Sequence, residues 1–104
     1  MPLWLSPIQV VVATISEKQK EYAKKIYNAF AGAGIRAELR NDNETIGKKI
    51  RETEMQKVPY IAVIGDKEVA AGAVAVRKRG EGDKGQMKFE LFLKQILEEI
   101  RKRA

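Results

Sequence analysis

Apolar and polar residues follow two periods along this chain, one typical of buried strands and one typical of amphipathic helices. Residues 8–15 form a nearly continuous apolar run, which predicts a strand buried on both faces. Ser16 and Gln19 then fit a capping box that opens a helix, and Gly32 and Gly34 mark its end. The apolar face of this helix consists of Tyr22, Ala23, Ile26, Ala29, Phe30 and Ala33.

The second half of the pattern predicts further elements of both kinds. Residues 36–39 alternate as a short strand, and the polar residues 41–44 form a turn and N-cap cluster before a helix carrying Ile46, Ile50 and Met55. Pro59 opens a second buried strand, residues 65–67 form a tight turn, and residues 72–77 return as the partner strand of a hairpin. A glycine-rich loop comes next. Residues 87–103 then form a helix with the apolar stripe Phe89, Phe92, Leu93, Ile96, Leu97 and Ile100.

The predicted order is strand-helix-strand-helix-strand-strand-helix. Strands joined through helices are expected to be parallel with right-handed crossovers, and the hairpin adds an antiparallel edge. We therefore expect an α/β fold, with a mixed sheet of four or five strands flanked by three helices. Residues 1–7, with two prolines, are expected to be a linker, and residues 8–104 a single domain.

Composition narrows the functional classes. The chain has 20 Lys and Arg against 14 Asp and Glu, and a net charge of +6 favours a polyanionic partner. The absence of cysteine excludes thiolate metal sites and a cysteine nucleophile, and the absence of histidine removes the usual general base. No apolar stretch approaches the roughly 20 residues of a membrane span, so we expect no membrane partner.

Residues 80–85 match the GxGxxG dinucleotide pattern, but the context does not fit. No strand comes after the next helix, so no βαβ unit forms, and Glu81 and Asp83 would repel a pyrophosphate. A flexible loop is the better interpretation of these residues.

Four blocks of the sequence carry a resemblance to a known family: residues 4–10, 43–52, 58–68 and 72–77. In this order they resemble the C-terminal anticodon-binding domain of threonyl-tRNA synthetase, a class II synthetase, from about Leu3 to the last helix. The resemblance implies a cytoplasmic tRNA-binding domain that reads the second and third anticodon bases of threonine tRNA, with no DNA partner. It also implies that the linker leads from a catalytic domain outside this chain, and that ATP, threonine and zinc belong there. We expect no cofactor and no catalysis in this chain alone.

The resemblance also implies a set of site residues. The expected base contacts are Asn43, Glu68 and Arg77, with possible RNA contacts at Gly47 and Lys57. Splayed bases are read through hydrogen bonds on their edges, for which a carboxylate, an amide and a guanidinium are suited. The densest basic run, beside the glycine loop, supplies expected phosphate contacts at Lys78, Arg79 and Lys84.

Each of these residues also has a purely structural interpretation. Asn43 at a helix start is by default an N-cap, and Glu68 with Arg77 could form a cross-strand ion pair. Gly47 could be tolerated without a role, and the basic run could be a solvated strand end. Lys57 stands where the family often has Arg and lacks its planar fork, and Asp42 stands where a basic residue is common.

Three other functional classes share parts of this pattern. They are the anticodon-binding domain of a related class II synthetase for proline, histidine or glycine, a structural or dimerisation module of the same fold, and a doubly wound enzyme. The opening at residues 4–9 and the block at residues 43–47 argue against the first. The lack of a catalytic constellation argues against the third.

Overall fold

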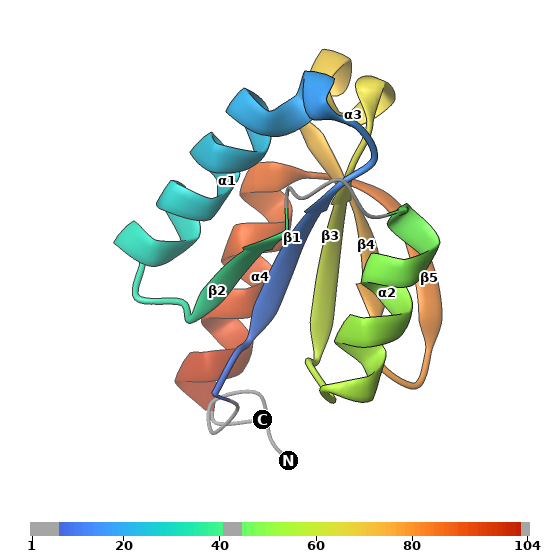
Figure 1. Ribbon diagram of the computed structural model, residues 1–104. Coiled ribbons are helices and arrows are strands. Elements are labelled where there is room, and N and C mark those ends of the chain that lie inside the picture. The colour runs from blue at the N-terminus through green and yellow to red at the C-terminus, as the bar shows by residue number, and fades with distance from the viewer. Residues whose placement is uncertain (1–6, 41–44, 103–104) are drawn as a thin grey trace.

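The computed structural model describes residues 7–40 and 45–102, which form a five-stranded sheet and four α-helices (Figure 1). Of the predicted linker, only Pro7 is among the described residues. The strands are β1 (Val10–Thr14), β2 (Ala37–Arg40), β3 (Tyr60–Ile64), β4 (Ala73–Lys78) and β5 (Gly82–Lys88). The helices are α1 (Lys20–Gly32), α2 (Ile46–Met55), α3 (Asp66–Ala71) and α4 (Phe89–Lys102), and a 3-10 turn, η2 (Glu17–Gln19), precedes α1.

The sheet has the strand order β2-β1-β3-β4-β5. The central strand β1 pairs in parallel with β2 and β3, whereas β3–β4 and β4–β5 are antiparallel. The predicted α/β class, the mixed sheet and the antiparallel edge are therefore confirmed, whereas the described residues form four α-helices and not the three predicted. Both β1 and β3 are buried at all five positions, as the continuous apolar runs predicted.

Helices α1 and α4 cover one face of the sheet, and α2 lies on the other (Figure 1). The main core lies under α1 and α4, where Phe30 and Phe92 pack edge to face with ring centroids 5.9 Å apart. Tyr60 extends this aromatic cluster from β3, 5.6 Å from Phe92. The α2 face is smaller, with Ile46 and Ile50 packed against the sheet. The edge strand β5, at the far side of the sheet from β2, has most of its residues exposed.

The predicted tight turn at residues 65–67 is wrong, because a short helix, α3, occupies this place. Gly65 precedes the helix, and the Glu68 side chain accepts a hydrogen bond from the Gly65 N–H at 2.8 Å. Gly72, with φ +63°, ends it in the left-handed conformation that glycine adopts without strain. The acidic first turn, the capping by Glu68 and the two alanines stabilise a helix more than a tight turn.

The predicted glycine-rich loop is also wrong. Gly80 and Gly82, both with positive φ, make a turn, and β5 begins at Gly82. The strand has no apolar alternation apart from Met87, because it is an edge strand with most of its residues exposed. Its only sequence signal was therefore the turn chemistry that precedes it.

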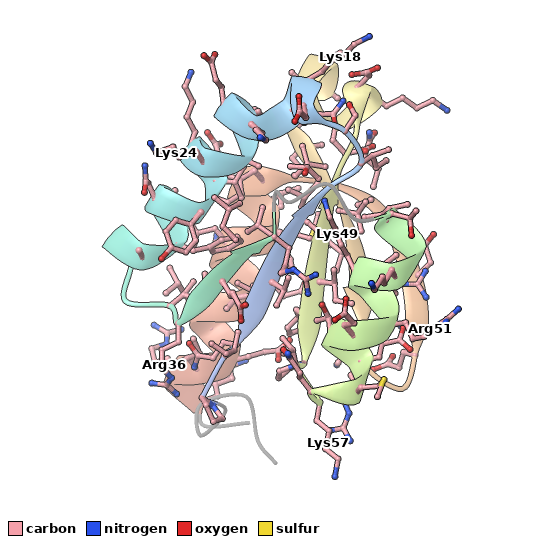
Figure 2. The ribbon with its side chains drawn as sticks, viewed as in Figure 1. Lys18, Lys24, Arg36, Lys49, Arg51 and Lys57 are labelled. Carbon is pink, nitrogen blue, oxygen red and sulfur yellow. The ribbon has the colours of Figure 1, made fainter. Side chains whose placement is uncertain are left out.

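The apolar stripe predicted for α2 is correct at Ile46 and Ile50 and wrong at Met55, which is 75% exposed. The stripe instead continues through Lys49 and Thr53, both buried at helical spacing. Lys49 points inward between α2 and the sheet in Figure 2, where its Nζ donates to the Thr14 carbonyl oxygen at 2.8 Å and lies 3.3 Å from Thr14 Oγ1. A buried lysine thus holds α2 against the end of β1.

Candidate nucleic-acid interface

Glu68 is nearly buried, with 8% of the residue exposed, just beyond the carboxyl end of β3. Its Oε1 accepts from the Gly65 N–H, and its Oε2 accepts from Gln86 Nε2 at 3.1 Å. One carboxylate oxygen is therefore used to start α3, and the other faces β5. The structure fixes the position of this carboxylate more firmly than an exposed turn would.

Gln86 marks a polar surface on the α2 side of β4 and β5. It pairs with Ala75, which packs against the small core under α2, so both residues lie on that face. Arg77 is two positions further along β4 and therefore lies on the same face. Gln86 itself is exposed. Glu68, Gln86 and Arg77 follow one another along this face. We call these three residues the polar line.

Arg77 is held beside α2. Its Nη2 lies 3.6 Å from Glu54 Oε1, and the two side chains are 31% and 52% exposed. The buried Nε of Arg77 has no hydrogen-bond partner within the described part of the chain. The ion pair with Glu68 that the hairpin suggested is absent between these two described residues, because each of the two side chains has another partner. The exposed part of the guanidinium remains accessible at the polar surface.

Gly47 lies in the first turn of α2, and α2 starts at the end of the sheet where α3, which carries Glu68, lies (Figure 1). A Cβ at this position would meet nothing within 4 Å, so packing inside the domain does not require glycine here. The N-cap of α2 is Thr45, whose Oγ1 accepts from the Lys48 N–H at 3.2 Å. Asn43, the predicted N-cap and base contact, lies outside the described residues. Capping by Thr45 corrects the default interpretation of Asn43.

Lys57 lies at the opposite end of the sheet from Glu68, directly after α2. Figure 2 shows its side chain extending away from the body of the domain. The length of β3 separates the two residues, about 13 Å at the rise of an extended strand. Lys57 also has φ +62°, the left-handed conformation that usually favours glycine. The structure does not bring Lys57 into the polar line.

The predicted phosphate contacts gather at the β4–β5 turn. Lys78 and Lys84 both contact the Glu81 carboxylate, at 3.1 Å and 2.6 Å. Arg79 is exposed next to them and makes no salt bridge with any described residue. Lys78 lies on the α4 side of the sheet, with its Nζ 5.8 Å from the centroid of the buried Tyr60 ring. Lys78 therefore faces away from its neighbour Arg77, as alternation along a strand requires.

Two other kinds of site, a metal site and a membrane-spanning helix, are absent from the described residues. Among residues 7–40 and 45–102, no three acidic, histidine or cysteine side chains gather where they could hold a metal ion. No helix in these two ranges is long and apolar enough to cross a membrane. Within residues 7–40 and 45–102, the one large pKa change affects Tyr60, whose hydroxyl is buried and donates to Glu99 Oε1 at 2.5 Å, both of which raise its pKa. That phenol packs in the core, away from the polar line.

Known proteins share both the sequence and the fold. Residues 9–99 match the family described as "Anticodon binding domain". The chain belongs to the anticodon-binding domain family. It is 53% identical over 102 residues to a threonine–tRNA ligase of Carboxydothermus hydrogenoformans and 50% identical over 99 residues to one of Bacteroides fragilis. These alignments cover 98% and 95% of this chain, but only 16% and 15% of those ligases.

A solved structure agrees with this assignment. The crystal structure of the RNA binding domain of threonyl-tRNA synthetase from Cryptosporidium parvum is similar with a TM-score of 0.89 and 31% identity. The similarity covers 94% of this chain and 25% of that one. The resemblance to the anticodon-binding domain of threonyl-tRNA synthetase, and the fold that it implied, are confirmed. The chain spans about one sixth of the length of the curated ligases that it matches.

Sequence reasoning missed two polar residues of this anticodon-binding domain. Gln86 lies in the segment that the sequence predicts to be a loop. Only the glycine turn at Gly80 and Gly82 signals that this segment is a strand beside Glu68. Lys49 had a usable signal, because it is three residues after Ile46 and one before Ile50 on the buried stripe of α2. A charged residue on an apolar stripe indicates a buried partner, which here is the Thr14 carbonyl.

Proposed function

We propose that this chain is the domain with which a threonyl-tRNA synthetase recognises the anticodon arm of threonine tRNA, reading its second and third bases, guanine and uracil. The observation that carries the proposal is the polar line on the exposed side of β4 and β5, in a basic member of the anticodon-binding family. The role of the chain is recognition without bond making or breaking. The mechanism depends on how each group of the line is held.

Glu68 supplies a carboxylate of fixed position. Its Oε1 is held by the Gly65 N–H inside the domain, whereas its Oε2 is held by the exposed Gln86. An amide side chain at the surface exchanges its hydrogen bond for one to an incoming group more readily than a buried backbone N–H does. A base edge that donates an N–H takes the outer oxygen, and the oxygen inside the domain keeps the carboxylate aimed.

Arg77 supplies the donors that complement Glu68. Its guanidinium can donate to carbonyl oxygens and ring nitrogens of a base, and its only ion pair among the described residues is the long, exposed one with Glu54. A surface pair of this kind contributes about 0–1 kcal/mol, so a base acceptor can compete with it. The donor and the acceptor at the two ends of the polar line together define which base edges fit.

Asn43 is proposed to contact a base, and Gly47, in the first turn of α2, is proposed to contact the RNA. Gly47 has open space above it, which allows a nucleotide to approach the helix backbone closely. Lys57, at the far end of β3, is proposed to contact the RNA backbone only. Arg79, Lys78 and Lys84 at the β4–β5 turn supply positive charge for phosphates, which adds affinity without base preference.

The rest of the synthetase is proposed to carry the chemistry. The chain contains neither histidine nor cysteine, so its residues do not fit a zinc site of the usual nitrogen and sulfur ligands. We assign ATP, threonine and zinc to a catalytic domain of the parent enzyme, which acts in the cytoplasm. On its own this chain is proposed to bind RNA weakly and to activate no amino acid.

The test compares binding of this domain to the threonine anticodon stem-loop and to stem-loops with the second or third anticodon base replaced. Duplex DNA of equal length is the control for general attraction to polyanions. The proposal expects the threonine stem-loop to bind about tenfold or more tightly than either replacement. Preference for a proline, histidine or glycine anticodon would assign the domain to a related synthetase. Equal binding to every RNA and to DNA would refute base recognition and favour a structural module.

A further inference from the structure

Glu81 lies between two lysines at the tip of the β4–β5 turn. Its Oε2 is 3.1 Å from Lys78 Nζ, and its Oε1 is 2.6 Å from Lys84 Nζ. Each oxygen of one carboxylate therefore contacts a different ammonium group. A carboxylate bridging two cations in this way occupies the position that two oxygens of a phosphodiester would take, and both anions carry one negative charge.

The turn itself builds this arrangement. The Glu81 N–H donates to the Lys78 carbonyl oxygen at 3.0 Å, and the glycines on either side of Glu81 have φ of +83° and +76°. Lys84 lies at an irregularity of the β4–β5 register, since Gly85 pairs with Val76 and Asp83 with Arg77, which leaves Lys84 without an opposite residue. The turn and the bulge together direct both lysines to one point.

The local electrostatics agree with the geometry. The two lysines hold the pKa of the Glu81 carboxyl below its usual value, so the group is ionised at neutral pH. With the exposed Arg79 beside them and Asp83 in the same turn, Lys78, Lys84 and Glu81 leave an excess of one positive charge at the tip. An RNA backbone is drawn to this excess, but the place between the lysines is already filled.

We propose that Lys78 and Lys84 form a binding site for one RNA phosphate and that Glu81 occupies this site until RNA displaces it. The inference rests on the phosphate contacts of the proposed function and adds the displacement to them. It predicts that Glu81 weakens binding of every RNA, whatever its sequence. It also predicts a shallow salt dependence, because Glu81 lowers the positive charge with which the tip neutralises phosphates, and the RNA then releases fewer of its counterions.

The test uses Glu81→Gln, with Asp83→Asn as the matched control. Both changes remove one negative charge and keep the size of the side chain. Asp83 Oδ1 accepts from the Gly85 N–H, and Asp83 makes no ion pair within the described residues. We expect Glu81→Gln to increase affinity for a uridine single strand and for all anticodon stem-loops by about fivefold, more than Asp83→Asn does. The salt slope should steepen by about 0.7, one phosphate equivalent for a single strand.

Two further results decide the interpretation. In a Lys78→Ala/Lys84→Ala background, Glu81→Gln should have no more effect than Asp83→Asn, because the site no longer exists. Equal effects of the two charge removals in the otherwise unchanged domain would overturn the proposal, and so would a loss of affinity in Glu81→Gln. The effect of Glu81→Gln does not depend on whether the domain reads bases. If the domain does not discriminate between anticodons, the proposed function is refuted, but the proposal of a phosphate site at Lys78 and Lys84 still stands.

Discussion

Replacing Glu68 should lower the stability of the fold as well as RNA recognition. Two different substitutions at this position separate the two effects. In Glu68→Ala, the Gly65 N–H loses its acceptor at the start of α3, which costs about 1 kcal/mol for a cap. The bond to Gln86 Nε2 contributes about 1.5 kcal/mol at most, the low end of the range for a bond to a charged group, because Gln86 is exposed. Removal of the buried side-chain methylene adds about 0.8 kcal/mol. The expected loss is therefore about 2–3 kcal/mol of unfolding free energy.

Glu68→Gln keeps a side-chain oxygen that can accept from the Gly65 N–H, so we expect it to lose less than about 1 kcal/mol. The two variants are compared by thermal and urea unfolding at neutral pH. For a domain of this size, the alanine variant should melt about 10–15 °C lower, and the glutamine variant within about 5 °C of the unsubstituted domain. An unchanged urea slope would show that only stability has changed.

One result would refute this reasoning. If Glu68→Ala unfolds at the same temperature as the unsubstituted domain, the carboxylate does not stabilise the start of α3. The comparison also determines how binding is measured. Glu68→Gln, which preserves the fold, is the informative variant for RNA recognition, and Glu68→Ala mixes loss of binding with loss of structure.

Three other predictions concern single positions. Gly47→Ala should stabilise the isolated domain by about 1 kcal/mol, measured by urea unfolding, and should weaken binding of the threonine stem-loop if RNA approaches α2 closely. Lys57→Gly should raise the unfolding free energy by about 0.5–1 kcal/mol because it relieves the left-handed backbone, and no gain would contradict that conformation. The pKa of Tyr60 is raised in the folded state, so its contribution to stability is complete below the unfolded pKa of 10.0 and is lost as pH rises above it. Unfolding measured from about pH 8 to about pH 11 should therefore show a decline in stability that is smaller in Tyr60→Phe, and equal declines would contradict it.

The fold could be predicted from the sequence where burial on both sides left one interpretation. The nearly continuous apolar run at residues 8–15 favoured a central strand. The predicted stripe from Phe89 to Ile100 packs on the sheet as expected, except for Leu97, which is 38% exposed. The predictions for residues 65–67 and 80–85 failed for a common reason: glycine marks a change of direction without specifying the type of the next element. After Gly65 the chain forms a helix, because Glu68 can reach back to cap it. From Gly82 it forms a strand, because β4 offers it an edge.

The candidate site was predictable in its residue types and less so in its arrangement. Glu68 and Arg77 were identified together, but their separation onto one polar line depends on α3 and on Gln86, which only the structure provides. Lys78 and Lys84 were identified as basic, whereas their common contact with Glu81 depends on a turn and a bulge. Side chains that meet through a register irregularity cannot be found from spacing along the chain alone.

The central claim, that the polar line reads anticodon bases, is tested most directly by one cycle of binding measurements. Arg77→Lys keeps the positive charge and removes the planar fork, so general attraction to RNA is preserved. The account predicts that this change weakens binding of the threonine stem-loop by about 1–3 kcal/mol and has little effect on a stem-loop in which the base read by Arg77 is replaced. The same loss of affinity for every stem-loop would contradict it, because Arg77 would then contact the phosphate backbone and not a base.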